Sequence, residues 1–181
     1  MGSPKAGAML GEFTFLELVS RAAGGAFENV FAVQRAGGVP AVGITTLFED
    51  RHPLEAPVFG VAAALAHAQG RCFVLALDYP LLTTELLGEL RVRFEKSRAL
   101  LMAPRWSGKL QMLCAGYSSV LLPRIETRIR EGQLDLRGLA GETETEILGE
   151  DELRQQFPGE PLSNVNTPEE LALLERARQL R

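Results

Sequence analysis

Apolar and polar residues alternate along the chain in short blocks, and most blocks have the length of one strand or one helix. Residues 13–23 carry apolar side chains at helical spacing, and Gly24–Gly25 is expected to end that helix. Residues 58–69 form a second, alanine-rich helical block. Asn29–Gln34 and Gly43–Phe48 have the composition of strands, and each is followed by a turn or a polar loop.

The longest continuous apolar block, Cys72–Leu77, predicts a central strand that is covered on both faces. Asp78 follows it at once, and Tyr79–Pro80 breaks the strand. The next helix is expected over Glu85–Glu95, with Thr84 as its N-cap. Strand and helix blocks therefore follow each other in turn, which favours an α/β fold built from parallel βαβ units.

The second half of the chain gives weaker signals. Two strands and a helix are predicted there: Ala99–Ala103, Leu110–Ala115, and a helix that begins at Ser118 or Ser119. Gly132–Gln156 is polar and is expected to be irregular. Thr167, followed three residues later by Glu170, predicts a capping box at the start of a last helix.

The length of 181 residues favours one domain over residues 1–181, and the composition, 46% hydrophobic and 23% charged, is ordinary for a globular protein. A net charge of -4 argues against a nucleic-acid partner. Cys72 and Cys114 lack metal-site spacing and are interpreted as free buried thiols, and no zinc motif is present. Without a membrane-length apolar stretch or a signal-peptide pattern, we expect a cytoplasmic protein with no membrane contact.

Asp78 is the first candidate for chemistry, because loops at the carboxyl ends of parallel strands form the binding crevice of an open sheet. A carboxylate there suits Mg²⁺ carried by a nucleotide triphosphate, since that ion prefers one or two carboxylates together with phosphate oxygens. A turn cap before Pro80 is an equally good interpretation of Asp78 from the sequence alone.

Other polar residues are candidates only in combination. Asn164 and Asn166 lie on the same side of an extended segment, so both amides can face one pocket, although a polar loop before a helix explains them as well. Asp50 is either a ligand or a turn residue. Lys5, in a loop of small residues, can hold phosphates or belong to a loose chain end.

Taken together, these segments resemble one family, the molybdenum cofactor guanylyltransferases. The matching stretches occur in the family's order: MGSPKA at 1–6, DRHPLEAPVFGVAAAL at 50–65, VLALDYPLL at 74–82, GKLQMLCAGY at 108–117 and LSNVNTPEEL at 162–171. The resemblance reaches from residue 1 to about residue 174. Its N-V-N segment favours a guanylyl over a cytidylyl transferase.

The resemblance implies a three-layer, Rossmann-like nucleotidyltransferase fold of the GT-A type with a mostly parallel central sheet. It also implies an enzyme that uses Mg²⁺ to transfer GMP from GTP to molybdopterin, and that contacts other molybdenum-cofactor proteins transiently. The residues to which the resemblance assigns roles are Asp78 for catalysis and metal binding, Lys5 for the triphosphate, Asp50, Pro57 and Gly60 for the nucleotide or pterin, and Asn164 and Asn166 near the phosphates.

The chain departs from the family pattern in three places. The first strand and the Gly-rich arginine loop of the family have no counterpart before Met1, so we expect the natural protein to begin earlier. Ala56 and Phe59 replace small residues, and Met112 replaces a proline. These departures leave two alternatives: a cytidylyltransferase acting on the same pterin, and an inactive relative that binds nucleotide or cofactor.

Overall fold

The computed structural model describes residues 8–35, 37–38, 40–50, 52–165, 167 and 169–172. Its strands are β1 (Met9–Leu10), β2 (Phe13–Thr14), β3 (Ala32–Gln34), β4 (Thr46–Phe48), β5 (Arg71–Leu75), β6 (Leu101–Trp106), β7 (Lys109–Leu110), β8 (Cys114–Ser118) and β9 (Thr145–Leu148). Its helices are α1 (Phe15–Ala26), α2 (Pro57–His67), α3 (Thr84–Lys96), the 3-10 turn η2 (Ser119–Leu121), α4 (Leu122–Arg130), α5 (Leu136–Glu142) and α6 (Glu150–Gln156).

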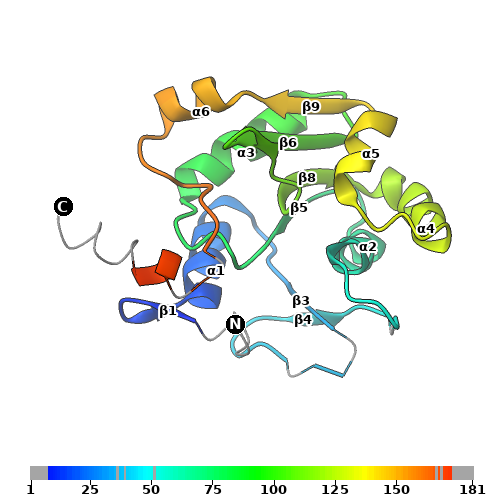
Figure 1. The fold of residues 1–181 in the computed structure, drawn as a ribbon, viewed down its shortest axis with the longest axis horizontal. Helices are drawn as coiled ribbons and strands as arrows, with labels where there is room; N and C mark the ends of the chain where they lie inside the picture. The colour runs from blue at the N-terminus through cyan, green and yellow to red at the C-terminus, as the bar shows by residue number, and fades with distance from the viewer. Residues whose placement is uncertain are drawn as a thin grey trace.

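The larger sheet has the order β5–β8–β6–β7, and β9 pairs with β6. Strand β8 is antiparallel to β5 and to β6, and β9 is parallel to β6, so β5, β6 and β9 run in the same direction. In Figure 1, α1, α3 and α6 lie on one side of the strands and α2, α4 and α5 on the other. This arrangement confirms the three-layer α/β fold class, with β8 running against its neighbours.

Strands β3 and β4 form a separate parallel pair. Within the described residues, β3 pairs only with β4 and β5 pairs only with β8, so each has one edge without a strand partner. Helix α2 packs against β3, β4 and β5 and so spans both sheets. The described strands therefore leave a break between β3 and β5.

Two apolar clusters hold the layers together. One lies under α1 and α3 and contains Leu86, Phe94 and Trp106. The other lies under α2, α4 and α5 and contains Val61 and Tyr117. Apolar burial on both faces of the sheet is the main stabilising term in such a fold, at about 25 cal/mol for each Å² removed from water.

Helix α1 runs through Gly24–Gly25 to Ala26, so the predicted end at the glycines was wrong. A Cβ added to Gly25 would lie 2.5 Å from Thr84 Oγ1, at the start of α3. Glycine is therefore needed here for close approach of two helices, and the tertiary contact outweighs the usual helix-ending effect of glycine.

The interpretation of Gly132–Gln156 as irregular was wrong, because α5, β9 and α6 all lie in it. Asp135 caps α5 by accepting from Gly138 N at 2.9 Å, and β9 is specified by its pairing with β6.

The predicted strand Leu110–Ala115 is divided between β7 and β8. The N-cap of α3 is Thr83 instead of Thr84, while the capping box of Thr167 and Glu170 is present.

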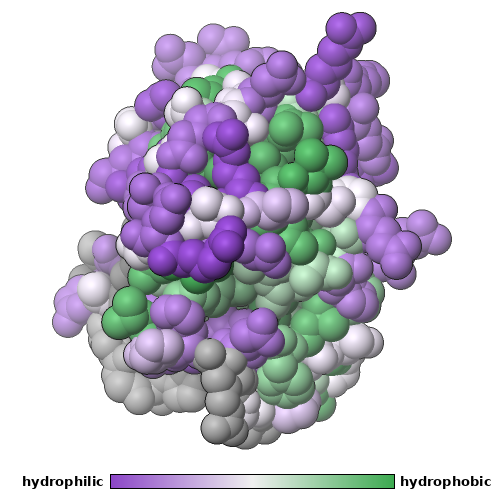
Figure 2. Space-filling view, turned by 90° about the vertical axis from the view of Figure 1, so that its right-hand side faces the viewer, coloured by the Kyte–Doolittle hydropathy of each residue, from purple (hydrophilic) through white to green (hydrophobic). Residues whose placement is uncertain are grey.

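Polar side chains cover most of the face drawn in Figure 2, and an apolar band runs between them. The large apolar side chains exposed on the molecule come from separate elements and loops: Met9, Phe13, Phe31, Val33, Val42, Phe48, Leu54, Val120 and Ile147. In the described residues, no helix is both long enough and apolar enough to cross a membrane.

Gly116 in β8 gives a test of the packing between the sheet and α3. A Cβ at this position would lie 2.6 Å from the Phe94 ring, so Gly116→Ala should lower the free energy of unfolding by about 1–3 kcal/mol, as expected of overpacking. Gly88→Ala, on α3 with nothing within 4 Å, should instead raise it by up to about 1 kcal/mol. Urea unfolding of both variants would check this pair, and equal effects would contradict it.

Candidate functional site

Asp78 lies in the turn that follows β5, three residues beyond the last strand residue, Leu75. Ala76 N donates to Leu113 O at 2.7 Å and so continues the ladder with the chain before β8. Pro80 is buried, and Leu82 N donates to Tyr79 O at 3.2 Å. Asp78 is half-buried. The hydrogen bond of Ala76 holds the backbone before it, and that between Leu82 and Tyr79 holds the backbone after it.

The chain after α6 returns across the molecule towards α1 (Figure 1), and it contacts Asp78 through Val165. We call residues 157–165 the strap. Val165 N donates to the carbonyl oxygen of Asp78 at 2.8 Å, and Val165 is buried against Leu10 and Phe15. This hydrogen bond brings Asn164 beside Asp78, although the two residues are 86 positions apart in the sequence.

Two more contacts hold the strap. Leu162 is 1% exposed and belongs to the core cluster under α3. Glu160 accepts from Arg154 Nη1 at 2.9 Å, and this hydrogen bond is the main reason that the pKa of Glu160 lies below its usual value. The Arg154 guanidinium also lies over the Trp106 ring, 4.1 Å from its centroid. Together with Val165, Glu160 and Leu162 hold the strap at three positions.

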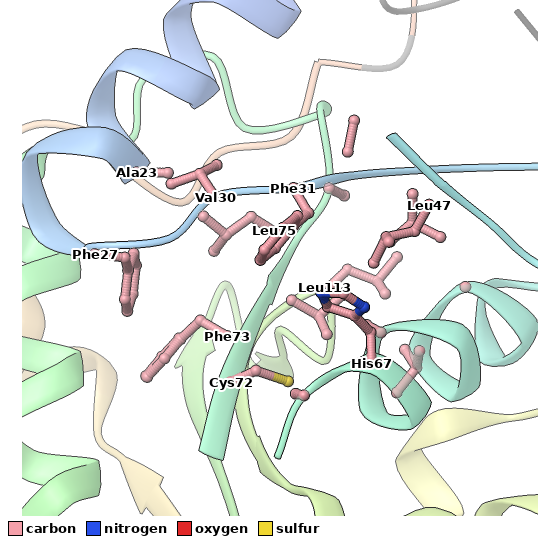
Figure 3. Close-up of a pocket in the computed structure, with 18 of the residues that line it drawn as sticks. Ala23, Phe27, Val30, Phe31, Leu47, His67, Cys72, Phe73, Leu75 and Leu113 are labelled. Carbon is pink, nitrogen blue, oxygen red and sulfur yellow. The ribbon is translucent and has the colours of Figure 1, made fainter. Parts of the chain in front are cut away.

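A cavity of about 1110 Å³ lies between β3 and β5, and it is larger than most small-molecule pockets. Its walls come from α1, the segment that leads into β3, α2 and β5. Figure 3 shows Phe31 and His67 facing each other across part of it, with ring centroids 4.6 Å apart. Leu75 and Leu113 add to an apolar interior.

Helix α2 begins at the edge of this cavity. Pro57 occupies its first turn, where the missing N–H leaves no hydrogen bond unmade, and Pro57 and Gly60 both line the cavity. Phe59 stands where the family resemblance expects a small residue. Its ring stacks on His52 at 4.0 Å between centroids and thereby holds the loop before the helix.

Glu49 is a candidate that sequence reasoning missed. It follows β4, its N–H donates to Gln34 O at 2.9 Å, and it lines the cavity. A Cβ added to Gly60 would be 3.7 Å from Glu49 Oε2, so the carboxylate lies close to the start of α2. Burial raises the pKa of Glu49 above its usual value, and Arg35 partly opposes the shift. Its position beside Asp50 at a strand end was the only signal in the sequence.

The structure divides the predicted site residues into two groups. Asp78 and Asn164 lie together, with Asn164 exposed. Pro57 and Gly60 line the cavity, and the exposed Asp50 follows Glu49 at its edge. The cavity also includes Leu77, the neighbour of Asp78, so it lies between the two groups. The remaining predictions, Lys5 and Asn166, fall outside the described residues.

The oxygen atoms of Asp78 and Asn164 suit a hard divalent cation that arrives with a nucleotide. Among the described residues, no group of three or more His, Cys, Asp or Glu side chains could hold a metal ion without such help. One or two protein oxygens together with phosphate oxygens are the set that Mg²⁺ prefers. The residues present therefore fit a metal that is shared with a substrate.

Both cysteines are free thiols, as expected from their spacing. Cys114 is fully buried in β8, while Cys72 faces the cavity (Figure 3). Burial raises the pKa of the Cys72 thiol to about 11 and that of Cys114 to about 12. Neither thiol is an activated nucleophile, because an activated cysteine has a lowered pKa.

Solved structures share this fold. Molybdopterin-guanine dinucleotide biosynthesis protein A from Archaeoglobus fulgidus superposes with a TM-score of 0.83 at 22% identity, covering 99% of this chain and 93% of that one. A 2-C-methyl-D-erythritol 4-phosphate cytidylyltransferase from Thermus thermophilus gives a TM-score of 0.72 at 17% identity, covering 97% and 94%. The topology and these neighbours define an α/β fold of the nucleotidyltransferase class.

The chain belongs to the family of MobA-like NTP transferase domains, whose profile matches residues 1–146. A probable molybdenum cofactor guanylyltransferase from Thermococcus gammatolerans is 35% identical over 121 residues, which are 66% of this chain and 62% of that protein. One from Mycobacterium marinum is 29% identical over 177 residues, covering 94% and 85%. The chain thus spans less than two thirds of the length of the first relative. Nucleotidyltransferases of this family generally use a divalent metal.

The raised pKa of Cys72 predicts how stability depends on pH. The folded state holds the thiol proton more tightly than the unfolded state, whose thiol has a pKa near 9.0. The protonated thiol therefore contributes fully to the free energy of unfolding below pH 9. About 2 kcal/mol of this contribution is lost as the pH rises towards 11. The variant Cys72→Ser has no side chain at position 72 that titrates between pH 9 and 11. Urea unfolding from pH 7 to 11 should show a smaller loss for the variant, and parallel curves would contradict the prediction.

Proposed function

We propose that this protein transfers GMP from GTP to molybdopterin, releasing pyrophosphate and forming molybdopterin guanine dinucleotide. Its family and the names of its relatives support this reaction. The observation that carries the proposal is the hydrogen bond from Val165 to Asp78, since it joins the N-V-N segment to the acidic strand end. Two sequence motifs that resemble the guanylyltransferase family thereby meet in one site.

The proposed site binds the triphosphate at the carboxyl end of β5. Asp78 holds Mg²⁺, which supplies positive charge to the phosphates when it is bound, and Asn164 offers its amide beside it. Pro57 and Gly60, at the start of α2, line the side that takes the base or the pterin. Asp50 lies near this side, and Lys5 and Asn166 complete the phosphate contacts by analogy with the family.

The reaction needs alignment and charge neutralisation more than a protein nucleophile. An oxygen of the molybdopterin phosphate attacks the α-phosphorus of GTP. The bond from that phosphorus to the bridging oxygen of the β-phosphate breaks, and its electron pair leaves with pyrophosphate. The raised thiol pKa values agree with this scheme, because neither cysteine is poised to form a covalent intermediate.

Asp78→Asn should lower Mg²⁺-dependent GMP transfer by a factor on the order of 100 or more, because the amide keeps the shape of the side chain and loses its charge. Pyrophosphate release, measured with GTP and molybdopterin, would show the loss. Asp151→Asn is the matched control, since Asp151 is exposed on α6 and is not among the residues of the proposed site or of the cavity lining. Full activity of Asp78→Asn in a preparation whose parent is active would show that another group binds the metal.

GTP with Mg²⁺ should stabilise the folded protein more than CTP, ATP or UTP. At a concentration a hundred times its dissociation constant, a ligand bound only by the native state adds about 2.7 kcal/mol to the free energy of unfolding. Thermal unfolding with each nucleotide would measure the difference. A preference for CTP would favour a cytidylyltransferase, and GTP binding without pyrophosphate release would favour an inactive, nucleotide-binding relative.

A further inference from the structure

Two segments of the proposed site are held by the same hairpin, which β6 and β7 form. On one side, the Tyr79 hydroxyl donates to Gln111 Oε1 at 2.9 Å. Gln111 Nε2 in turn donates to the carbonyl oxygens of Trp106 and Lys109, at 2.9 and 3.1 Å. Because Tyr79 follows Asp78 directly, these hydrogen bonds connect the hairpin to the turn that carries the proposed metal ligand.

On the other side, one residue of α6, Arg154, is fixed to the same hairpin by two routes. Its guanidinium lies over the Trp106 ring, 4.1 Å from the ring centroid. It also binds Glu150 Oε1 with two nitrogens, Nε at 3.0 Å and Nη2 at 2.9 Å. The other oxygen of Glu150 accepts from Gly108 N, in the turn of the hairpin, at 3.1 Å. The position of the guanidinium is therefore set by the hairpin.

The third nitrogen of Arg154 reaches the strap. Nη1 donates to Glu160 Oε1 at 2.9 Å, and Glu160 Oε2 accepts from Ser163 Oγ at 3.0 Å. Ser163 N also donates to Glu160 O at 3.1 Å, so both the side chain and the backbone of Glu160 hold Ser163. Asn164 is the next residue. The contacts that begin at Arg154 thus end one residue before the proposed phosphate ligand.

We propose that Arg154 is a positioning residue for the transfer reaction, which binds Glu160 and thereby sets the place of Asn164 relative to Asp78. The role in transfer rests on the proposed function, whereas the holding of the strap does not. An arginine suits this position, because one planar guanidinium can stack on a ring and bind two carboxylates at the same time.

The exposure of the ion pair indicates where its effect will appear. The side chains of Arg154 and Glu160 are 41% and 51% exposed, and exposed ion pairs add little to the free energy of unfolding. The strap is neither helix nor strand, so it can open locally while the sheet stays folded. Loss of the pair should therefore change the opening of the strap much more than the unfolding of the whole protein.

Amide hydrogen exchange at Val165 tests the holding of the strap without turnover. The Val165 N–H donates to Asp78 O, and a hydrogen-bonded amide exchanges when its bond opens. Arg154→Met, which keeps an unbranched apolar side chain, should lower the protection of this amide about tenfold. The Ser118 amide, hydrogen-bonded in the larger sheet, is the internal reference and should keep its protection.

Arg93→Met is the matched control. Arg93 lies on α3 and also binds two glutamates, Glu89 on its own helix and Glu152 on α6. Its ion pairs end at these two helices and do not include the strap. Loss of Val165 protection in Arg154→Met alone would support the inference. No loss in Arg154→Met, or an equal loss in both variants, would overturn it, because burial or α6 as a whole would then hold the strap.

A double-mutant cycle asks whether Arg154 acts through Glu160. If it does, Arg154→Met should cause no further loss of Val165 protection in protein that already carries Glu160→Ala, because the strap no longer offers its carboxylate. Losses that multiply would show that Arg154 acts on the strap by another route and would overturn the inference.

Kinetics of GMP transfer test the positioning role. Arg154→Met should lower kcat about fivefold with the KM for GTP nearly unchanged, as expected of lost alignment, while Arg93→Met keeps the parent values. Parent kinetics in Arg154→Met would overturn the role in transfer and leave the proposed reaction standing. A parent protein that releases no pyrophosphate from GTP and molybdopterin would overturn the proposed reaction, and hydrogen exchange would still decide whether Arg154 holds the strap.

Discussion

The antiparallel pairing of β8 with both β5 and β6 is the contact on which the rest of the structure depends. Every residue of β8 is buried, and among the described residues β5 has no other strand partner. The strand end that carries Asp78 is therefore held in the sheet from one side only. Gly116 makes this possible at the centre of β8, because its missing side chain leaves room for Phe73 and Phe94.

The strap completes the site from the opposite end of the chain. It is anchored by Arg154 to Glu160, by burial of Leu162, and by the hydrogen bond from Val165 to Asp78. Residues 157–165 themselves form neither helix nor strand, so the strap owes its position to tertiary packing. A segment held in this way can present an exposed residue, Asn164, beside Asp78.

A cavity of about 1110 Å³ lies at the break between β3 and β5, and it separates the two groups of candidate residues. On one side are Asp78 and Asn164, and on the other are Glu49 and the start of α2 at Pro57. Helix α2 packs against the strands on both sides and holds the two sheets together. Ligand contacts from both sides would join two parts of the fold that the described strands do not connect, and for this reason we expect a bound nucleotide to stabilise the fold.

The sequence by itself determined the alternation of strands and helices, the apolar character of β5 and the capping box at Thr167, because these features depend on neighbouring residues. It also identified Asp78 and Asn164 as candidates. Tertiary structure alone decided that they meet, because the hydrogen bond from Val165 to Asp78 joins distant segments. The same holds for β9, whose short sequence becomes a strand through pairing with β6, and for Gly25, which serves the approach of α1 to α3 instead of ending a helix. Glu49 became a candidate only through burial beside Gly60, a property that no local pattern encodes.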